Sequence, residues 1–197
     1  MSKTLINRVR ELAFATGAQA LGVAPAERFS QAPKPYWPSS YLPGARSVVV
    51  VGVHYPDACV EECGDKDLQA MNAYGIVQVD MNILLDVLSF RIARLLDREG
   101  FGAVSFSTSH IWRYRPFGEI DRSFTPDFAH RHAAVAAGLG EFGWNGLVIN
   151  PEFGPRIRFN CIITQAELPP RPMYAGPALC DKCMRCEKHC SMDTFRK

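Results

Sequence analysis

The sequence lacks several features that mark specialised classes of protein. No apolar stretch is long enough to span a bilayer, and the first residues have no apolar core of the kind found in signal peptides. No long basic run accompanies the formal net charge of +2, so the composition indicates no nucleic-acid partner. Internal repeats and low-complexity tracts are absent as well. These absences predict an ordinary globular protein of the cytoplasm.

The chain divides into a body and a short C-terminal segment. Its 197 residues, 47% hydrophobic and 21% charged, suffice for one medium domain with a buried core and a small appendage. Prolines at positions 169, 170, 172 and 177 form a stiff linker between the two parts. We therefore expect a domain over residues 1–168 and a separate segment over residues 169–197.

Hydrophobic periodicity predicts alternating helices and strands in the body. Helices are expected over residues 3–16, 74–99 and 127–137, and strands over residues 20–24, 47–53, 103–106, 147–149 and 159–164. The strand at 47–53 is almost continuously β-branched, which suits a central position in a sheet. Between these elements, residues 25–43, 56–70 and 107–128 are expected to be loops. The pattern favours an α/β or α+β sandwich with the C-terminal segment appended.

Four of the seven cysteines stand in one short run. Cys180, Cys183, Cys186 and Cys190 have the spacing C-x2-C-x2-C-x3-C, which is that of bacterial ferredoxins. Two-residue gaps let a tight loop direct three thiolates at one cubane, and iron–sulfur clusters prefer soft thiolate ligands. Zinc sites usually come as two separated pairs of ligands, and a disulfide framework would suit a secreted protein. The run therefore predicts a [4Fe-4S] cluster in a reducing compartment.

The sequence leaves the fourth ligand of this cluster open. In two-cluster ferredoxins the fourth cysteine of such a run ligates the other cluster and precedes a proline, whereas Ser191 follows Cys190 here. If Cys190 does not complete the cluster, the alternative ligands are Cys59, Cys63 and Cys161. A further possibility is a cysteine group beyond Lys197. We expect the natural protein to continue past this residue and to carry that group.

A glycine-rich segment precedes the linker. Glycines stand at positions 138, 140, 143 and 146, and the first three fit the pattern G-x-G-x-x-G. A dinucleotide-binding turn follows a strand and opens a helix, whereas here a helix is expected before the glycines and a strand after them. Glycines at this density indicate positive φ angles and a close approach of the backbone to a flat or bulky group. The alternative is a tight helix-to-strand connection that binds nothing.

The surroundings of these glycines resemble a known protein family. The run over residues 130–147, HRHAAVAAGLGEFGWNGL, is similar to the corrinoid-binding segment of reductive dehalogenases and epoxyqueuosine reductases, and is closer to the dehalogenases. The similarity continues through residues 150–159 and 163–164, and the cysteine run follows at the family's distance. Residues 42–50 are similar to the family's first long strand.

The resemblance implies a fold, two kinds of cofactor and a set of site residues. In the family, a nitroreductase-like α/β fold binds cobalamin with its lower base detached, and a ferredoxin-like module with two cubane clusters supplies electrons. The implied cofactor-binding residues are Gly138, Leu139, Gly140, Gly143, Asn145 and Gly146, whose backbone would lie against the corrin or its tail. The cysteines of the second cluster and the acidic proton donor of the epoxyqueuosine branch have no counterpart in this sequence, which leaves the substrate open.

Two residues are candidates for the chemical step. Reductive cleavage needs a proton donor and a cation that stabilises developing negative charge. Tyr114 stands between two arginines, where neighbouring cations would lower the pKa of its phenol, and Arg156 is the candidate cation. An exposed Tyr–Arg stack and a structural ion pair are the respective alternatives. His130 and His132 are two residues apart on an expected helix and so face different directions.

The sequence therefore predicts a corrinoid-dependent reductase, in which the [4Fe-4S] cluster passes electrons to cobalamin for reductive cleavage of a small substrate. A non-catalytic cobalamin-binding or electron-carrying protein, and a flavin enzyme on the same fold, are the alternatives. The expected partners are a small-molecule substrate and an external donor such as ferredoxin or flavodoxin. No membrane is expected, and no nucleic acid unless the substrate is a tRNA nucleoside.

Overall fold

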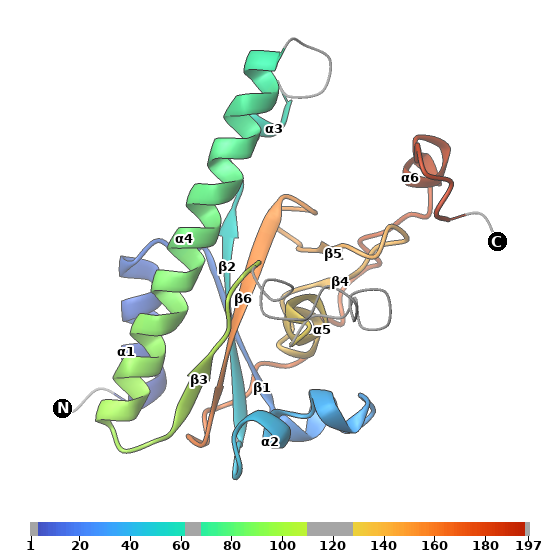
Figure 1. The fold of residues 1–197 in the computed structure, drawn as a ribbon. Coiled ribbons are helices and arrows are strands. Elements are labelled where there is room, and N and C mark those ends of the chain that lie inside the picture. Colours follow the sequence, from blue (N-terminus) through green and yellow to red (C-terminus); the bar gives the residue numbers. More distant parts are fainter. Residues whose placement is uncertain (1–3, 62–67, 110–127, 196–197) are drawn as a thin grey trace, which may run out of the picture.

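The structure is a computed structural model that describes residues 4–61, 68–109 and 128–195, with the backbone alone for residues 68–73 (Figure 1). The elements in chain order are α1 (Leu5–Ala15), β1 (Ala20–Pro25), the 3-10 turns η1 (Ala26–Phe29) and η2 (Lys34–Tyr36), α2 (Pro38–Tyr41), β2 (Ser47–His54), α3 (Asp57–Glu61), α4 (Leu68–Arg98), β3 (Ala103–Ser105), α5 (His130–Ala136), β4 (Glu141–Phe142), β5 (Val148–Ile149), β6 (Ile157–Thr164) and α6 (Arg185–Lys188). In these ranges, no helix combines the length and the hydropathy that crossing a bilayer requires.

A four-stranded antiparallel sheet forms the centre of the body. Its strand order is β1-β2-β6-β3, and β2 pairs with β6 from Ser47–Thr164 to His54–Ile157. Seven of the eight residues of β2 are buried, as expected for the β-branched run. All pairings in the sheet are antiparallel, so of the two expected fold classes the structure is α+β.

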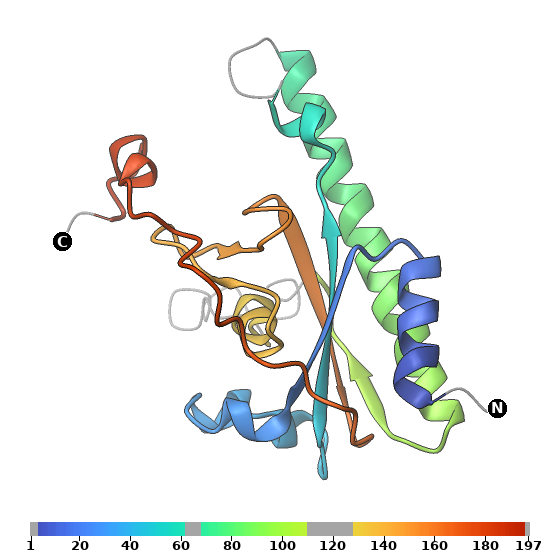
Figure 2. The same cartoon turned by 180° about the vertical axis from the view of Figure 1, so that it is seen from behind.

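Helices cover both faces of this sheet. Successive side chains of a strand point to opposite faces, so Val49 and Val51 pack toward α1 and α4, whereas Val48 and Val50 pack toward α5. Figures 1 and 2 show α1 and α4 on one side of the sheet, with α5 and the β4–β5 hairpin on the other. The two layers separate the face that packs on α1 and α4 from the one that carries the glycine segment and the linker.

The structure corrects three sequence-based expectations. The segment at 56–70, expected to be a loop, contains α3 and the start of α4, which begins at Leu68 rather than near residue 74. Polar composition concealed α3, whose Asp57 lies in the first turn, where a negative charge favours a helix. Strand β4 was missed because it consists of only two residues inside the glycine segment.

The linker runs along the edge of the sheet before it reaches the cysteines. The backbone N–H of Arg171 donates to the carbonyl of Val23 in β1, at 2.9 Å. Beyond this contact the segment continues past α5 and the β4–β5 hairpin to α6, which lies apart from the sheet (Figure 2). No helix or strand is assigned to residues 169–179.

Candidate functional site

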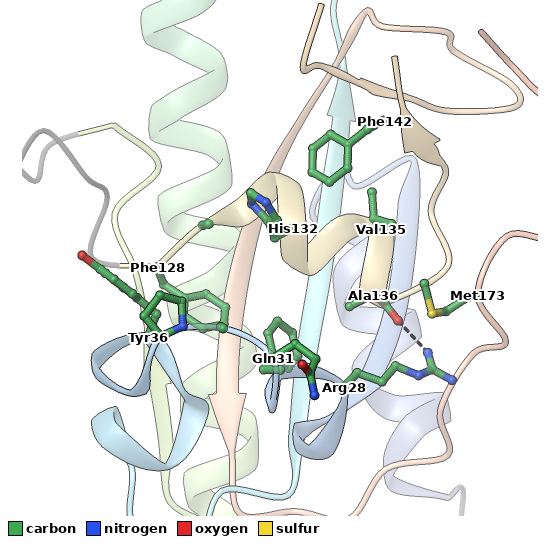
Figure 3. A pocket seen from close by; sticks show the side chains of 13 residues that line it. Arg28, Gln31, Tyr36, Phe128, His132, Val135, Ala136, Phe142 and Met173 are labelled. Carbon is green, nitrogen blue, oxygen red and sulfur yellow. Dashed lines mark hydrogen bonds between the residues drawn. The ribbon is translucent and has the colours of Figure 1, made fainter. Parts of the chain in front are cut away.

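A pocket of about 630 Å³ lies between α5 and the turns that follow β1. This volume is within the range of small-molecule and cofactor sites. Most of the lining is aromatic or aliphatic, with a few polar groups among it (Figure 3). The lining residues are Arg28, Phe29, Gln31, Ala32, Pro33, Tyr36, Phe128, Ala129, His132, Val135, Ala136, Phe142 and Met173. These residues come from four separate parts of the chain, so only the folded protein brings them together.

Helix α5 presents different residues to the sheet and to the pocket. Ala133, Ala134 and Ala137 are fully buried, and their small side chains let the helix lie close to β1. A Cβ atom added at Gly22 of β1 would lie 2.4 Å from the carbonyl oxygen of Ala137, so only glycine permits this approach. The other side of α5 contributes Val135 to the pocket wall.

Arg28 fastens the linker to the end of α5 at the edge of the pocket. One guanidinium nitrogen, Nη1, donates to the carbonyl of Ala136 at 2.5 Å and to the carbonyl of Arg171 at 2.8 Å. The first of these bonds is drawn in Figure 3. A cation at a helix C-terminus satisfies a free carbonyl and complements the helix dipole. Arg28 thereby holds the linker where Met173 can line the pocket.

The histidines of α5 do face different directions, as their spacing predicted. His132 lines the pocket, and its ring centroid lies 4.9 Å from that of Phe142. His130 points into the body, where its Nδ1 lies 3.2 Å from the sulfur of Cys161 and its Nε2 lies 3.2 Å from the carbonyl oxygen of Ser107. Burial lowers the pKa of His130 and raises the pKa of Cys161 well above the usual value for a thiol. The His130–Cys161 pair is therefore uncharged and part of the core.

The glycine segment packs against its own chain. A Cβ atom added at Gly138 would lie 2.0 Å from the carbonyl oxygen of Pro172, and one at Gly140 would lie 2.1 Å from that of Ile149. Both residues have positive φ, at 72° and 154°. These two glycines thus let the linker and β5 approach the end of α5.

The other expected cofactor-binding residues also have partners within the protein. Leu139 is only 1% exposed and belongs to the core. Gly143 lies close to Ile149, and Gly146 has φ at 71° in the turn of the β4–β5 hairpin. The side-chain oxygen of Asn145 accepts a hydrogen bond from the backbone N–H of Leu147, at 3.0 Å. The structure brings these residues together in one hairpin beside the pocket, where Phe142 is the residue that lines it.

The hairpin also holds the start of the cysteine run. Oε1 of Glu141 accepts hydrogen bonds from the backbone N–H groups of Leu179, at 2.5 Å, and Cys180, at 3.2 Å. The backbone N–H of Trp144 donates to the sulfur of Cys180, at 3.4 Å. Hydrogen bonds from backbone N–H groups to cysteine sulfur are among the features that tune iron–sulfur clusters. The hairpin therefore contacts both the pocket and the first expected ligand.

The cysteine run has the donor chemistry of a cluster site. Two residues between the cysteines, Lys182 and Met184, have positive φ at 54° and 59°, which turns the chain tightly. Backbone N–H groups of Thr194 and Met192 lower the pKa of the Cys190 thiol, which favours the thiolate that metals bind. In the described ranges, however, no three His, Cys, Asp or Glu side chains are grouped closely enough to hold a metal ion. The run thus has the ligand types of a cluster site, although its thiols are not grouped in the described structure.

Two of the alternative fourth ligands are poorly placed for this role. Cys161 is 0% exposed in β6 and contacts His130. Cys59 lies in α3 at the far end of α4, away from α6 (Figure 1). Cys63 lies outside the described residues. The structure therefore favours Cys190 over Cys59 and Cys161.

The structure describes one of the two catalytic candidates. Tyr114 lies outside the described residues. Arg156 donates to Asp57, at 2.7 Å, and to Glu61, at 2.9 Å, which links β6 to α3. The hydrogen bond from Arg156 lowers the pKa of Asp57, so this ion pair is charged at neutral pH. Arg156 is not among the pocket-lining residues. It forms structural ion pairs, which was the alternative interpretation of this residue.

The sequence did not identify Arg28, Phe142 or Met173 as site residues. Arg28 and Met173 are isolated residues in segments without a motif, and no local pattern distinguishes them. A signal for the pocket existed only in the proline- and aromatic-rich composition of residues 25–43.

Comparisons with known proteins connect this arrangement to a family. No protein-family model matches the chain. The tetrachloroethene reductive dehalogenase of Desulfitobacterium hafniense is 46% identical over 59 residues, which are 29% of this chain and 11% of that protein. The tetrachloroethene reductive dehalogenase of Sulfurospirillum multivorans is 39% identical over 59 residues, 29% of this chain and 12% of that protein. The matched region is thus a small part of either relative.

Solved structures extend the similarity over nearly the whole chain. A reductive dehalogenase whose structure suggests a mechanism for B12-dependent dehalogenation has a TM-score of 0.69 at 20% identity, covering 94% of this chain and 24% of that one. An epoxyqueuosine reductase bound to a tRNA stem loop has a TM-score of 0.62 at 19% identity, covering 97% of this chain and 52% of that one.

The chain is similar to reductive dehalogenases in local sequence and in fold, and to epoxyqueuosine reductases in fold. The resemblance expected from the sequence is confirmed, because the local identity and the shared fold point to the same family. The family shares its fold with this chain, and this chain spans about half or less of the family structures that it matches.

Proposed function

We propose that this chain forms the cofactor-binding part of a corrinoid-dependent reductase. A [4Fe-4S] cluster held by Cys180, Cys183, Cys186 and Cys190 would pass electrons to cobalamin bound at the pocket beside the β4–β5 hairpin. The observation that carries the proposal is the path of the linker. Met173 lines the pocket, and Cys180 is bonded to Glu141 and Trp144 of the hairpin, so one short segment joins the two sites.

The pocket suits a flat macrocycle better than a nucleotide. Its walls are aromatic and aliphatic, and Gln31, Tyr36 and His132 supply polar groups that can bond to amide side chains of a corrin. No glycine turn at the start of a long helix is present in the described ranges to hold a pyrophosphate, which also argues against a dinucleotide. We further propose that the α+β body is nitroreductase-like and that the cysteine segment is ferredoxin-like.

The residues of the chain would position the cofactor and manage protons. Bound cobalamin would supply a strongly reducing metal centre for cleavage of a substrate bond. Phe142, Val135 and Met173 would exclude water from one face of that centre. The imidazole of His132 lines the pocket, where it could donate a hydrogen bond or a proton to a bound substrate. Tyr114 and Arg156 stay proposed catalytic residues, although Arg156 would first have to leave its ion pairs.

The relatives offer two classes of substrate. One is a small organohalide such as tetrachloroethene, and the other is the modified nucleoside of a tRNA. The apolar pocket walls and the higher local identity favour a small apolar substrate. We propose an external low-potential donor such as ferredoxin or flavodoxin, and a cytoplasmic location in which the thiols stay reduced.

The test is anaerobic reconstitution with iron, sulfide and cobalamin. We expect about four irons and four sulfides per chain by chemical analysis, and a change in the visible spectrum of cobalamin on binding. Val135→Trp fills the pocket and should weaken cobalamin binding at least about tenfold, or 1.4 kcal/mol, while leaving the iron content unchanged. Phe14→Trp is the control, because Phe14 is exposed on α1 at the opposite face of the sheet.

Three results would decide against the proposal or narrow it. Chemical analysis that finds zinc instead of iron and sulfide would show that the cysteines do not hold an iron–sulfur cluster. Tight binding of FMN without binding of cobalamin would identify a flavin protein instead. Binding of both proposed cofactors without turnover of organohalide or epoxyqueuosine substrates would support the non-catalytic alternative.

A further inference from the structure

Helix α4 carries a second apolar face that no described part of the chain covers. Its inner face, which includes Leu85, Leu88, Ile92 and Leu96 at 0% exposure, packs on the sheet. An outer stripe is formed by Ile76, Val79, Ile83, Val87 and Phe90, which are 62%, 56%, 57%, 45% and 55% exposed. A helix that only covers a sheet needs one apolar stripe and has polar residues opposite. The outer stripe therefore indicates a partner.

The spacing of the outer stripe is that of a helix-packing seam. Its residues follow one another at intervals of three, four, four and three, so they lie along one line of the helix surface. The stripe extends over roughly 21 Å at 1.5 Å per residue. Its exposed residues lie on the surface of α4 opposite the buried inner face, and α4 lies on the side of the sheet away from α5 and the hairpin (Figure 1). The seam is therefore independent of the proposed cofactor sites.

Charges along the stripe show which partner fits. Asp80 precedes Val87 by seven residues and Arg94 follows it by seven, and both are exposed. The guanidinium of Arg94 lies 5.8 Å from the ring centroid of Phe90, which keeps this charge at the stripe. Opposite charges at equal distances from one point make the surface self-complementary under a two-fold rotation about that point.

We propose that two copies of the chain associate through α4, antiparallel, with Val87 at the two-fold axis. Ile83 of each copy then packs against Phe90 of the other, and Asp80 of each copy meets Arg94 of the other. A parallel pair would instead place Asp80 beside Asp80 and Arg94 beside Arg94, which is unfavourable. The charges therefore select the antiparallel arrangement.

A membrane surface fits this stripe less well than a second copy does. Helices that lie on membranes carry mostly basic residues beside the apolar stripe, whereas the exposed charges around this stripe have both signs: Asp80 and Asp97, with Arg91, Arg94 and Arg98. One helix pair of this length buries less than the roughly 800 Å² per partner of a standard interface. We therefore expect a dimer that dissociates on dilution.

The test is sedimentation velocity on the whole 197-residue chain, at concentrations from about 1 to 100 μM. We expect the sedimentation coefficient to rise from monomer to dimer across this range. Val87→Glu places two like charges at the axis and should raise the dissociation constant at least about tenfold. Leu147→Glu is the matched control, because Leu147 is 41% exposed on the hairpin at the other face of the sheet, and it should dimerise normally.

Exchanging the two charges distinguishes the antiparallel pairing from nonspecific hydrophobic association. Asp80→Lys and Arg94→Asp should each raise the dissociation constant about fivefold, because each creates two like-charge contacts in the dimer. The double variant restores both opposite-charge contacts with the signs exchanged. It should return the dissociation constant to within about twofold of the original. This rescue also shows that the single variants are folded.

Three outcomes would overturn the proposal. The chain could stay monomeric at the highest concentration, or its association could be equally insensitive to Val87→Glu and to the charge exchange. The third is a monomer that sediments with vesicles of mixed neutral and anionic lipid and loses this binding in Val87→Glu, which would identify the stripe as a membrane contact.

Discussion

The carboxylate of Glu141 joins the start of the cysteine run to the hairpin, and its replacement should loosen that run without unfolding the body, leaving the bond from Trp144 to the Cys180 sulfur as the remaining contact. In Glu141→Ala the backbone N–H groups of Leu179 and Cys180 lose their common acceptor. The rest of the linker stays attached through Arg28 and through the bond from Arg171 to Val23. The change should therefore be confined to the segment that follows the linker.

The size of the effect follows from the two hydrogen bonds. Bonds to a charged group contribute about 1.5–3 kcal/mol each when shielded, but Glu141 is partly exposed and solvent competes for it. We take about 2 kcal/mol for both together, which corresponds to roughly a 30-fold change in the local opening equilibrium. Amide hydrogen exchange at residues 179 and 180 of the cluster-free protein should accelerate by this factor.

Two comparisons make the test specific. Glu141→Gln keeps an acceptor oxygen without the charge, so it should accelerate exchange by a smaller factor than alanine does. Glu152→Ala removes an exposed carboxylate in the turn that follows β5 and should leave exchange at 179 and 180 unchanged. If Glu141→Ala also leaves these amides unchanged, Glu141 does not hold the run, and the connection between pocket and cluster that supports the proposed function is lost.

Three further predictions concern the core and the cluster. Asn160, fully buried, donates to the carbonyl of Phe106 at 2.9 Å and to Asp86 at 3.2 Å, so Asn160→Leu should lower the free energy of unfolding in urea by about 3 kcal/mol, with exposed Asn7→Leu as control. His130 has a folded pKa below its unfolded value, so the unfolded chain binds more protons below pH 6.5. The free energy of unfolding should therefore fall there by up to about 1.4 kcal/mol per pH unit, and His130→Phe should flatten this pH profile. Cys190→Ala should reduce the iron content after reconstitution, whereas Cys161→Ala should not; equal iron in both would contradict the assigned fourth ligand.

Much of the fold was predictable because the sheet and its helices depend on local patterns. The β-branched run of β2 and the apolar period of α4 are each long enough to identify an element and its buried face. The expected positions of α1, β1 and β6 agree with the structure within a few residues. Strand pairing was not predictable in the same way, since nothing local shows that β6 returns between β2 and β3.

The candidate site was only partly predictable, because its residues meet through tertiary contacts. The cysteines and glycines can be recognised in the sequence by their spacing. Arg28 matters only because the end of α5 and the linker both lie within reach of its guanidinium. The role of Glu141 is likewise visible only once residues 179 and 180 lie beside it. Composition gives no weight to one arginine or one glutamate among 22 basic and 20 acidic residues.

The glycine segment shows how one pattern can serve two purposes. Its density suggested close approach to a bound group, yet Gly138 and Gly140 are required first by the carbonyls of Pro172 and Ile149. A bulky residue at either position would displace the linker or β5 whatever the pocket holds, so loss of cobalamin binding in such a variant would not locate the cofactor. A substitution on the pocket side of α5, such as Val135→Trp, changes the cavity and spares these backbone contacts. Substitutions in the pocket wall are therefore the better test of where the cofactor binds. The glycines allow that wall, the hairpin and the linker to pack closely together.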